Sequence, residues 1–292
     1  MRKNSLTIAL IFASCLLMSC QQATSKAVQS QMTVEVAKPL ASIQEKTILT
    51  QSGGKVDFKG VSFSYNPQIF GAVKMEEVAE QILENKDDKP DYVEPQHHLF
   101  TFDSSTEYSE MYLAVYPVED FPRMYAVNKE SAEYMKQEIN NLKKVLKDKN
   151  FRVEDRIPYL RFYDASNSFY AKVKHFSFQS GEGILFLTHY GIGIEIVSNH
   201  NLTYVFEGLT TDKKHYVLAE ISVSVDFLPK EQTDEFEGYK IPWDKLSNKA
   251  EMKKLDNVKQ KIGKRLENLP QNKFDPNLKY FEEIISSLKI EK

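Results

Sequence analysis

Cysteine is nearly absent from this chain of 292 residues. Only Cys15 and Cys20 occur, both within the first twenty residues. The sequence after Cys20 therefore excludes a disulfide, a thiolate nucleophile and a cysteine-ligated metal. A domain without such cross-links depends on packing. Hydrophobic residues at 41% and aromatic residues at 12% are enough to fill a sizeable core.

An excess of either charge is also missing. The 38 basic and 41 acidic residues give a net charge of −3. Removal of residues 1–19 takes away Arg2 and Lys3, which leaves 36 basic against 41 acidic residues and a net charge of −5. This balance offers no electrostatic footprint for nucleic acid, so we expect no nucleic-acid partner.

The motifs of common catalytic sites are missing as well. The chain has no Gly-x-Ser-x-Gly nucleophile elbow and no Gly-Lys-Ser/Thr phosphate loop. Gly191-Ile-Gly193 lacks the third glycine of a dinucleotide-binding site. We therefore predict no cofactor and no catalytic residue. A carboxylate pair for glycoside hydrolysis stays open, because nothing in the sequence selects one pair.

The N-terminus has the pattern of an export signal. A basic start precedes an apolar run at 6–18 that is too short to span a bilayer. Residues 17–20, Leu-Met-Ser-Cys, are similar to a lipobox. We predict that residues 1–19 are a lipoprotein signal peptide and that Cys20 carries the lipid, including palmitate. An ordinary signal peptide or an uncleaved anchor is the alternative, and Cys15 lacks the preceding leucine.

The predicted location is the cell envelope. A single acyl chain binds a membrane only marginally, so a stable anchor needs more than one chain on Cys20. Gln21 follows in place of an aspartate. This favours the outer membrane in a Gram-negative host, and otherwise the outer face of the plasma membrane. Residues 20–54 are predicted to be the lipidated cysteine and a flexible tether, with a short strand at 32–36 as the alternative.

Residues 55–292 are predicted to form a single α+β domain. Alternating apolar patterns predict four hairpins, which pair 56–58 with 61–65, 98–102 with 111–118, 171–178 with 184–190, and 202–209 with 216–225. Residues 180–183, Ser-Gly-Glu-Gly, are expected to be the loop of the third hairpin, with glycines at positive φ. Residues 157–162 are a short strand or an edge segment.

Apolar stripes with helical spacing predict amphipathic helices. The clearest covers 129–147, with Asn128 as its N-cap. Two more lie at 245–268 and 277–289, within a C-terminal helical region of about 245–290, and 73–85 has a similar stripe. The expected fold is α+β: an antiparallel sheet of about eight strands with helices packed against it.

Two histidines are the only weak candidates for a metal site. A three-residue loop in the third hairpin would place His175 directly opposite His189, with Glu195 as a further ligand. A loop of any other length breaks that pairing, and packed or solvated rings are the simpler interpretation. His97 and His98 are adjacent and would point to opposite faces of a strand.

Several phrases along the chain resemble an uncharacterised family of bacterial exported proteins and lipoproteins. They are GVSFSYNP at 60–67, YLAVYPV at 112–118, FQSGEGILFLT at 178–188 and YVFEGLT at 204–210. The resemblance covers most of the chain after the signal and implies no activity. The chain differs from the family pattern at Lys213, where glycine is usual. A looser analogy of fold alone links the chain to PsbP-like domains.

These observations predict a lipid-anchored envelope lipoprotein that acts as a non-catalytic binding or accessory module. Its partners are the membrane, through Cys20, and an envelope protein, a peptide or a glycan. Aromatic residues on strands, such as Phe176 and Tyr204, are expected mainly in the core, and exposed ones could bind such a ligand. The alternatives are a hydrolytic or metal-dependent envelope enzyme and a structural partner of a larger assembly.

Overall fold

The computed structural model of the protein describes nine stretches of the chain. They are residues 49–84, 93–103, 111–148, 156–161, 166–167, 169–191, 194–232, 235–243 and 248–291. All of them belong to one compact unit that spans 45–292. The predicted signal peptide and Cys20 lie outside the described residues.

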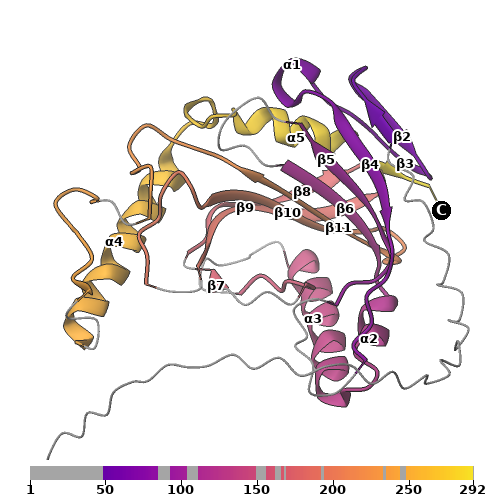
Figure 1. The fold of residues 1–292 in the computed structure, drawn as a ribbon, viewed down its shortest axis with the longest axis horizontal. Helices are drawn as coiled ribbons and strands as arrows, with labels where there is room; N and C mark the ends of the chain where they lie inside the picture. Colours follow the sequence, from indigo (N-terminus) through magenta and orange to yellow (C-terminus); the bar gives the residue numbers. More distant parts are fainter. Residues whose placement is uncertain are drawn as a thin grey trace, which may run out of the picture. The chain divides into compact units, whose positions relative to one another are not determined.

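Antiparallel pairing of neighbouring strands forms the central sheet (Figure 1). Among the described residues it has nine strands, in the order β1 (Leu49–Gln51), β4 (Val73–Val78), β5 (His97–Phe102), β6 (Met111–Pro117), β11 (His215–Ser222), β10 (Leu202–Thr210) and β9 (Gly181–Gly191), with β7 (Ser166–Asn167) and β8 (Ala171–Phe178) both paired to β9. Every pairing in it is antiparallel. The predicted α+β fold is confirmed.

A second, smaller sheet has the order β12-β3-β2. Its strands are β2 (Lys55–Phe58), β3 (Val61–Ser64) and β12 (Lys289–Ile290). Lys59 and Gly60 join β2 to β3 with φ values of 47° and 81°. Two positive φ angles in a two-residue loop match the twist of the flanking strands, so the predicted hairpin is confirmed.

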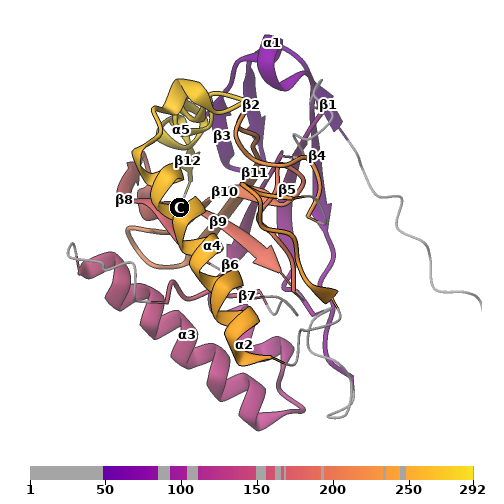
Figure 2. The ribbon, with the colours of Figure 1, turned by 90° about the vertical axis from the view of Figure 1, so that its left-hand side faces the viewer.

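Both faces of the large sheet are covered (Figures 1 and 2). The small sheet, α4 (Lys249–Asn268) and α5 (Leu278–Ser287) pack on one face, and α2 (Asp120–Met124) and α3 (Lys129–Lys147) pack on the other. We call these the α5 face and the α3 face. Short helices α1 (Pro67–Phe70) and η3 (Gln271–Lys273) complete the elements. Side chains of a strand alternate between the two cores, because successive residues point to opposite faces.

The three main helices follow their apolar stripes. Helix α3 has the predicted bounds, and the side chain of its N-cap Asn128 accepts a hydrogen bond of 3.2 Å from Ser131 N. Asn248 and Asn277 cap α4 and α5 in the same way. Among the described residues, no helix combines the length and apolar character needed to cross a membrane.

Two local predictions are wrong. The described part of the predicted helix at 73–85, residues 73–84, does not form one: the stretch begins with β4, which is held between β1 and β5. Strand β1 lies inside 20–54, so the folded part includes residues assigned to the tether. In both cases pairing with a distant strand, rather than the local pattern, decides the structure. Of the two alternatives for 157–162, the strand does not form in the described residues 157–161.

The third hairpin is tighter than predicted. Phe178 pairs with Gly181, so the loop is Gln179-Ser180, and neither Gly181 nor Gly183 has a positive φ. Both glycines lie in β9, where a methyl group on Gly183 would collide with the ring of Phe206. These glycines are therefore needed for the close approach of a neighbouring side chain and strand.

Candidate functional site

The two candidate metal-binding histidines lie on opposite faces of the sheet. His175 pairs with Ile184, and its Nε2 is 3.0 Å from the carbonyl oxygen of Asp148 at the end of α3. His189 pairs with Leu202 in β10. The three-residue loop that would have placed them together does not form, so that predicted pairing is wrong. Within the described ranges, no group of three or more His, Cys, Asp or Glu residues could hold a metal ion.

His189 is fully buried beneath α4. Its Nε2 lies 3.6 Å from Glu195 Oε1, which confirms the predicted neighbour but not a metal site. Burial, with a smaller effect of Lys259, lowers the pKa of His189 to about 4. The ring is therefore neutral at neutral pH, and its contact with Glu195 is polar rather than ionic.

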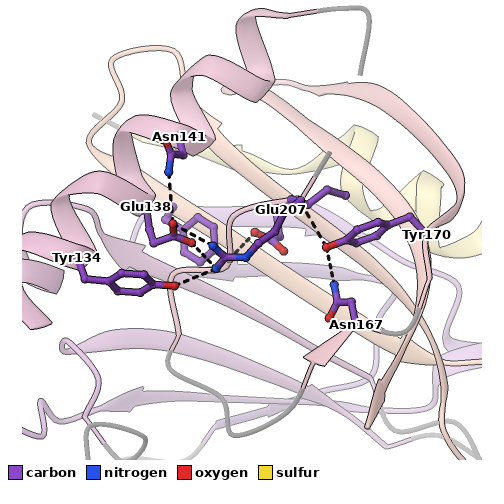
Figure 3. Close-up of polar contacts among 9 residues, drawn as sticks. Tyr134, Glu138, Asn141, Asn167, Tyr170 and Glu207 are labelled. Carbon is purple, nitrogen blue, oxygen red and sulfur yellow. Dashed lines mark hydrogen bonds and ion pairs between the residues drawn. The ribbon is translucent and has the colours of Figure 1, made fainter. Parts of the chain in front are cut away.

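A large group of polar side chains lies on the α3 face, and Figure 3 shows the part of it around Glu138, Glu207 and Tyr170. We call it the tyrosine–glutamate network, and its members are Tyr112, Tyr159, Tyr170, Tyr216, Glu138, Glu207, Glu220, Arg156 and Arg161. Alternation along β10 and β11 directs Glu207 and Glu220 to this side of the sheet. Clusters of titratable groups with shifted pKa values are the usual first candidates for a functional site.

Glu207 and Tyr216 form the most deeply buried part of the network. Tyr216 donates a hydrogen bond of 3.1 Å to Glu207 Oε2, and both side chains are fully buried. Burial raises the pKa of Glu207 well above its ordinary value, although the bond from Tyr216 opposes that shift. Burial therefore favours the neutral, protonated form of Glu207, and the side chain is out of reach of a ligand.

Glu220 lies in a second part of the network. Tyr159 donates to its Oε1 at 3.1 Å, and burial raises its pKa. Nearby, Arg161 donates to Tyr112 at 3.0 Å and lies 2.5 Å from Glu94. These bonds connect the loop at 156–161 to β6 and β11, so this part of the network stabilises the packing of that loop.

The third part joins α3 to the same loop (Figure 3). Arg156 donates to both carboxylate oxygens of Glu138, at 2.6 and 3.2 Å, and to the hydroxyl of Tyr134 at 2.9 Å. The carboxylate is only 3% exposed, so its charge must be neutralised by a close partner. We interpret the whole network as a polar joint between the sheet, α3 and the loop.

An open concavity lies beside the middle turns of α3, where the turn between β10 and β11 approaches the helix. It measures about 670 Å³, and we call it the lysine groove. One wall comes from α3, with Lys136, Asn140 and Lys143 on one helical face; the other comes from the turn, with Lys213 and Lys214. Four lysines thus line the groove together with a single carboxylate, that of Glu119.

The turn is held rigidly by its own side chains. Asp212 accepts hydrogen bonds from Thr210 Oγ1 at 2.7 Å and from Lys214 N at 3.1 Å, while His215 N donates to Thr210 Oγ1 at 3.0 Å. Lys213 adopts a φ of 62°. Lys213 therefore has the left-handed backbone conformation that glycine adopts most easily. With the turn in this conformation, Lys213 and Lys214 both line the groove.

The floor of the groove is partly apolar. Val118, Pro122 and Ile139 line it, and the half-buried His215 stands at its end. Burial lowers the pKa of His215, with Asp212 raising it and Lys214 lowering it further. The groove can therefore hold a ligand that has an anionic group beside an apolar part.

Two of the lysines are already partly neutralised. Lys136 lies 3.5 Å from Glu133, and Lys213 lies 3.6 Å from Glu182. Lys143 and Lys214 form no ion pair with another residue in the described part of the chain. They are exposed and come from opposite walls, so they are the cations most available to a ligand.

Sequence reasoning missed the lysine groove. The spacing of Lys136 and Lys143 places them two turns apart on one face of α3, which is a visible signal. Nothing in the sequence, however, indicates that Lys213 and Lys214 face that helix.

Comparisons of the chain with protein families, with curated proteins and with solved structures find no match to any of them.

Proposed function

We propose that the protein is a lipid-anchored, non-catalytic binding module of the cell envelope. The lysine groove carries the binding part of the proposal, because it is concave, open and of the size of a small-molecule site. Its described lining has lysines, a histidine, an asparagine and a glutamate, with no hydroxyl or thiol nucleophile. The strongly shifted carboxyl of Glu207 is fully buried and cannot act on the contents of the groove.

The anchor part of the proposal rests on the lipobox pattern that ends at Cys20. The 28 residues between Cys20 and Leu49 span at most about 100 Å when fully extended. A domain attached in this way works within that distance of the membrane surface. Its partners are then envelope molecules, and the groove selects an anionic one.

The anchor is tested by metabolic labelling of the full chain in a bacterial host with an alkyne analogue of palmitate. We expect wild type and Cys15→Ala to be labelled, and Cys20→Ala to be unlabelled and to leave the membrane fraction. Cys15→Ala is the matched control, because it removes the other cysteine. Label in Cys20→Ala, or its absence from wild type, would contradict the anchor.

Binding is tested by native mass spectrometry of the full protein in detergent after exposure to an envelope extract. We expect a noncovalent adduct on wild type that is lost from Lys143→Ala/Lys214→Ala and kept by Lys253→Ala/Lys264→Ala. The control pair removes two exposed lysines of α4. Recovery of the ligand with unchanged mass supports a binding module, whereas recovery of a converted product would indicate an enzyme.

A further inference from the structure

We infer that the lysine groove binds a phosphate ester: a phosphate group that carries an apolar or ring-containing substituent. This inference deepens the proposed function by naming the chemical class of its ligand. It rests on three observations, namely the placement of unpaired cations on two walls, the kind of cation, and the apolar floor.

The placement of the cations favours a compact anion. Lys143 projects from α3 and Lys214 from the rigid turn, so one anionic group between the walls is approached from both sides. Neither lysine forms an ion pair with a described residue, although Asp212 attracts Lys214 at longer range, whereas Lys136 and Lys213 each have a carboxylate within 3.6 Å. Binding thus supplies each of these two lysines with a direct counter-charge.

The kind of cation is consistent with a phosphate ligand. The described lining holds four lysines and no arginine. Lysine binds phosphate as a point charge and lacks the planar, two-pronged geometry with which arginine matches a carboxylate. The amide of Asn140, on the same helical face, adds a neutral donor.

The remainder of the groove requires more than inorganic phosphate. Its volume of about 670 Å³ lies in the range of sites for small organic ligands. Val118, Pro122 and Ile139 form an apolar surface beside the lysines. A ligand with both a phosphate and an apolar part fills the groove, whereas either part alone leaves half of it solvated.

Two sources supply this chemistry: a soluble phosphate monoester and the headgroup of an anionic phospholipid. The test is calorimetric titration of the full protein in detergent with phenyl phosphate, phenol and inorganic phosphate. A second arm uses glycerophosphoglycerol, the deacylated headgroup of phosphatidylglycerol. The variants are Lys143→Ala/Lys214→Ala and, as the matched control, Lys253→Ala/Lys264→Ala.

We expect phenyl phosphate to bind wild type and the control with equal affinity, more tightly than phenol or inorganic phosphate. The groove variant should bind it at least tenfold more weakly, by about 1.4 kcal/mol or more, because two charge-assisted contacts are lost. Competition by glycerophosphoglycerol assigns the lipid headgroup as the source, and its failure assigns a soluble ester. Equal binding by the groove and control variants, or none by wild type, would overturn the inference.

These outcomes are separable from those of the proposed function. An adduct without phosphorus in native mass spectra, together with no binding of phenyl phosphate, rejects the ligand class and keeps the binding module. Absence of the palmitate label from wild type rejects the anchor, and the calorimetric titration still tests the ligand class.

Discussion

Tyr216 donates its hydroxyl hydrogen to Glu207 across adjacent strands, although the two residues are offset by two positions in the register of β10 and β11. Glu207 pairs with Leu218 and Tyr216 with Leu209, so the hydrogen bond of 3.1 Å runs diagonally along the α3 face. Full burial in this position favours the protonated form of the carboxyl and raises its pKa.

This relationship predicts how stability depends on pH. The pKa of Glu207 is raised in the folded state, so above about pH 4.5 the unfolded state loses a proton that the folded state keeps. Stability from this group is therefore lost as pH rises. Glu207→Gln removes the effect, and we expect its free energy of unfolding relative to wild type to rise by about 1.4 kcal/mol per pH unit above pH 5 until the folded carboxyl titrates.

Urea unfolding between pH 5 and 8, followed by circular dichroism, measures this difference. Glu235→Gln serves as the control, because it makes the same change at an exposed glutamate. A flat difference for Glu207→Gln would show that Glu207 is ionised in the folded protein.

The close approach at Gly183 gives a second prediction. An added methyl group meets both the carbonyl oxygen of Glu207 and the ring of Phe206, and neither can withdraw from a packed core. We expect Gly183→Ala to lower the free energy of unfolding by about 2 kcal/mol or more. Gly53→Ala, with nothing within 4 Å of its added methyl, should change it by less than about 0.5 kcal/mol. Thermal unfolding of the two variants decides the matter, and similar melting temperatures would contradict it.

Local sequence signals predicted local structure well. Helix α3 was predictable because its apolar stripe and Asn128 act within one segment. The hairpin across Lys59 and Gly60 was predictable for the same reason. The stretch that contains β4 also has helical spacing, but its backbone hydrogen bonds go to β1 and β5, which no local pattern records.

The lysine groove could not be predicted from the sequence for the same reason: it depends on contacts between distant segments. Lys143 and Lys214 are 71 positions apart, and they line one cavity only because the turn after β10 ends beside α3. The position of a hairpin loop is equally decisive. The loop lies at Gln179-Ser180 rather than at 181–183, so His175 pairs with Ile184 and not with His189.

Lys213 gives a third prediction, because it keeps the positive φ that glycine adopts without strain. Its φ of 62° lies in the left-handed region, which costs a residue with a side chain about 1 kcal/mol of conformational energy. Lys213→Gly should therefore raise the free energy of unfolding by about 0.5–1 kcal/mol, even though it removes an exposed ion pair with Glu182, which is worth little. Lys214→Gly, at the next position and without a positive φ, should lower it instead. Chemical denaturation of both variants tests the opposite signs, and two changes of the same sign would contradict this account.

His189 predicts how the protein responds to acid. Its folded pKa of about 4 lies below the ordinary histidine value of 6.5, so between these values the unfolded state binds a proton that the folded state excludes. The stability that the neutral ring contributes is complete above pH 6.5 and is lost as pH falls to 4, by about 3 kcal/mol in total. His189→Gln should lack this loss, so the stability of wild type relative to the variant should fall by that amount across the window. His200→Gln makes the same change at an exposed histidine and serves as the matched control. The carboxyl groups are the same in all three proteins, so the difference in unfolding free energy between them reports the titration of the replaced histidine. A constant difference between wild type and His189→Gln from pH 4 to 6.5 would mean that the His189 ring accepts a proton as readily in the folded protein as in the unfolded chain.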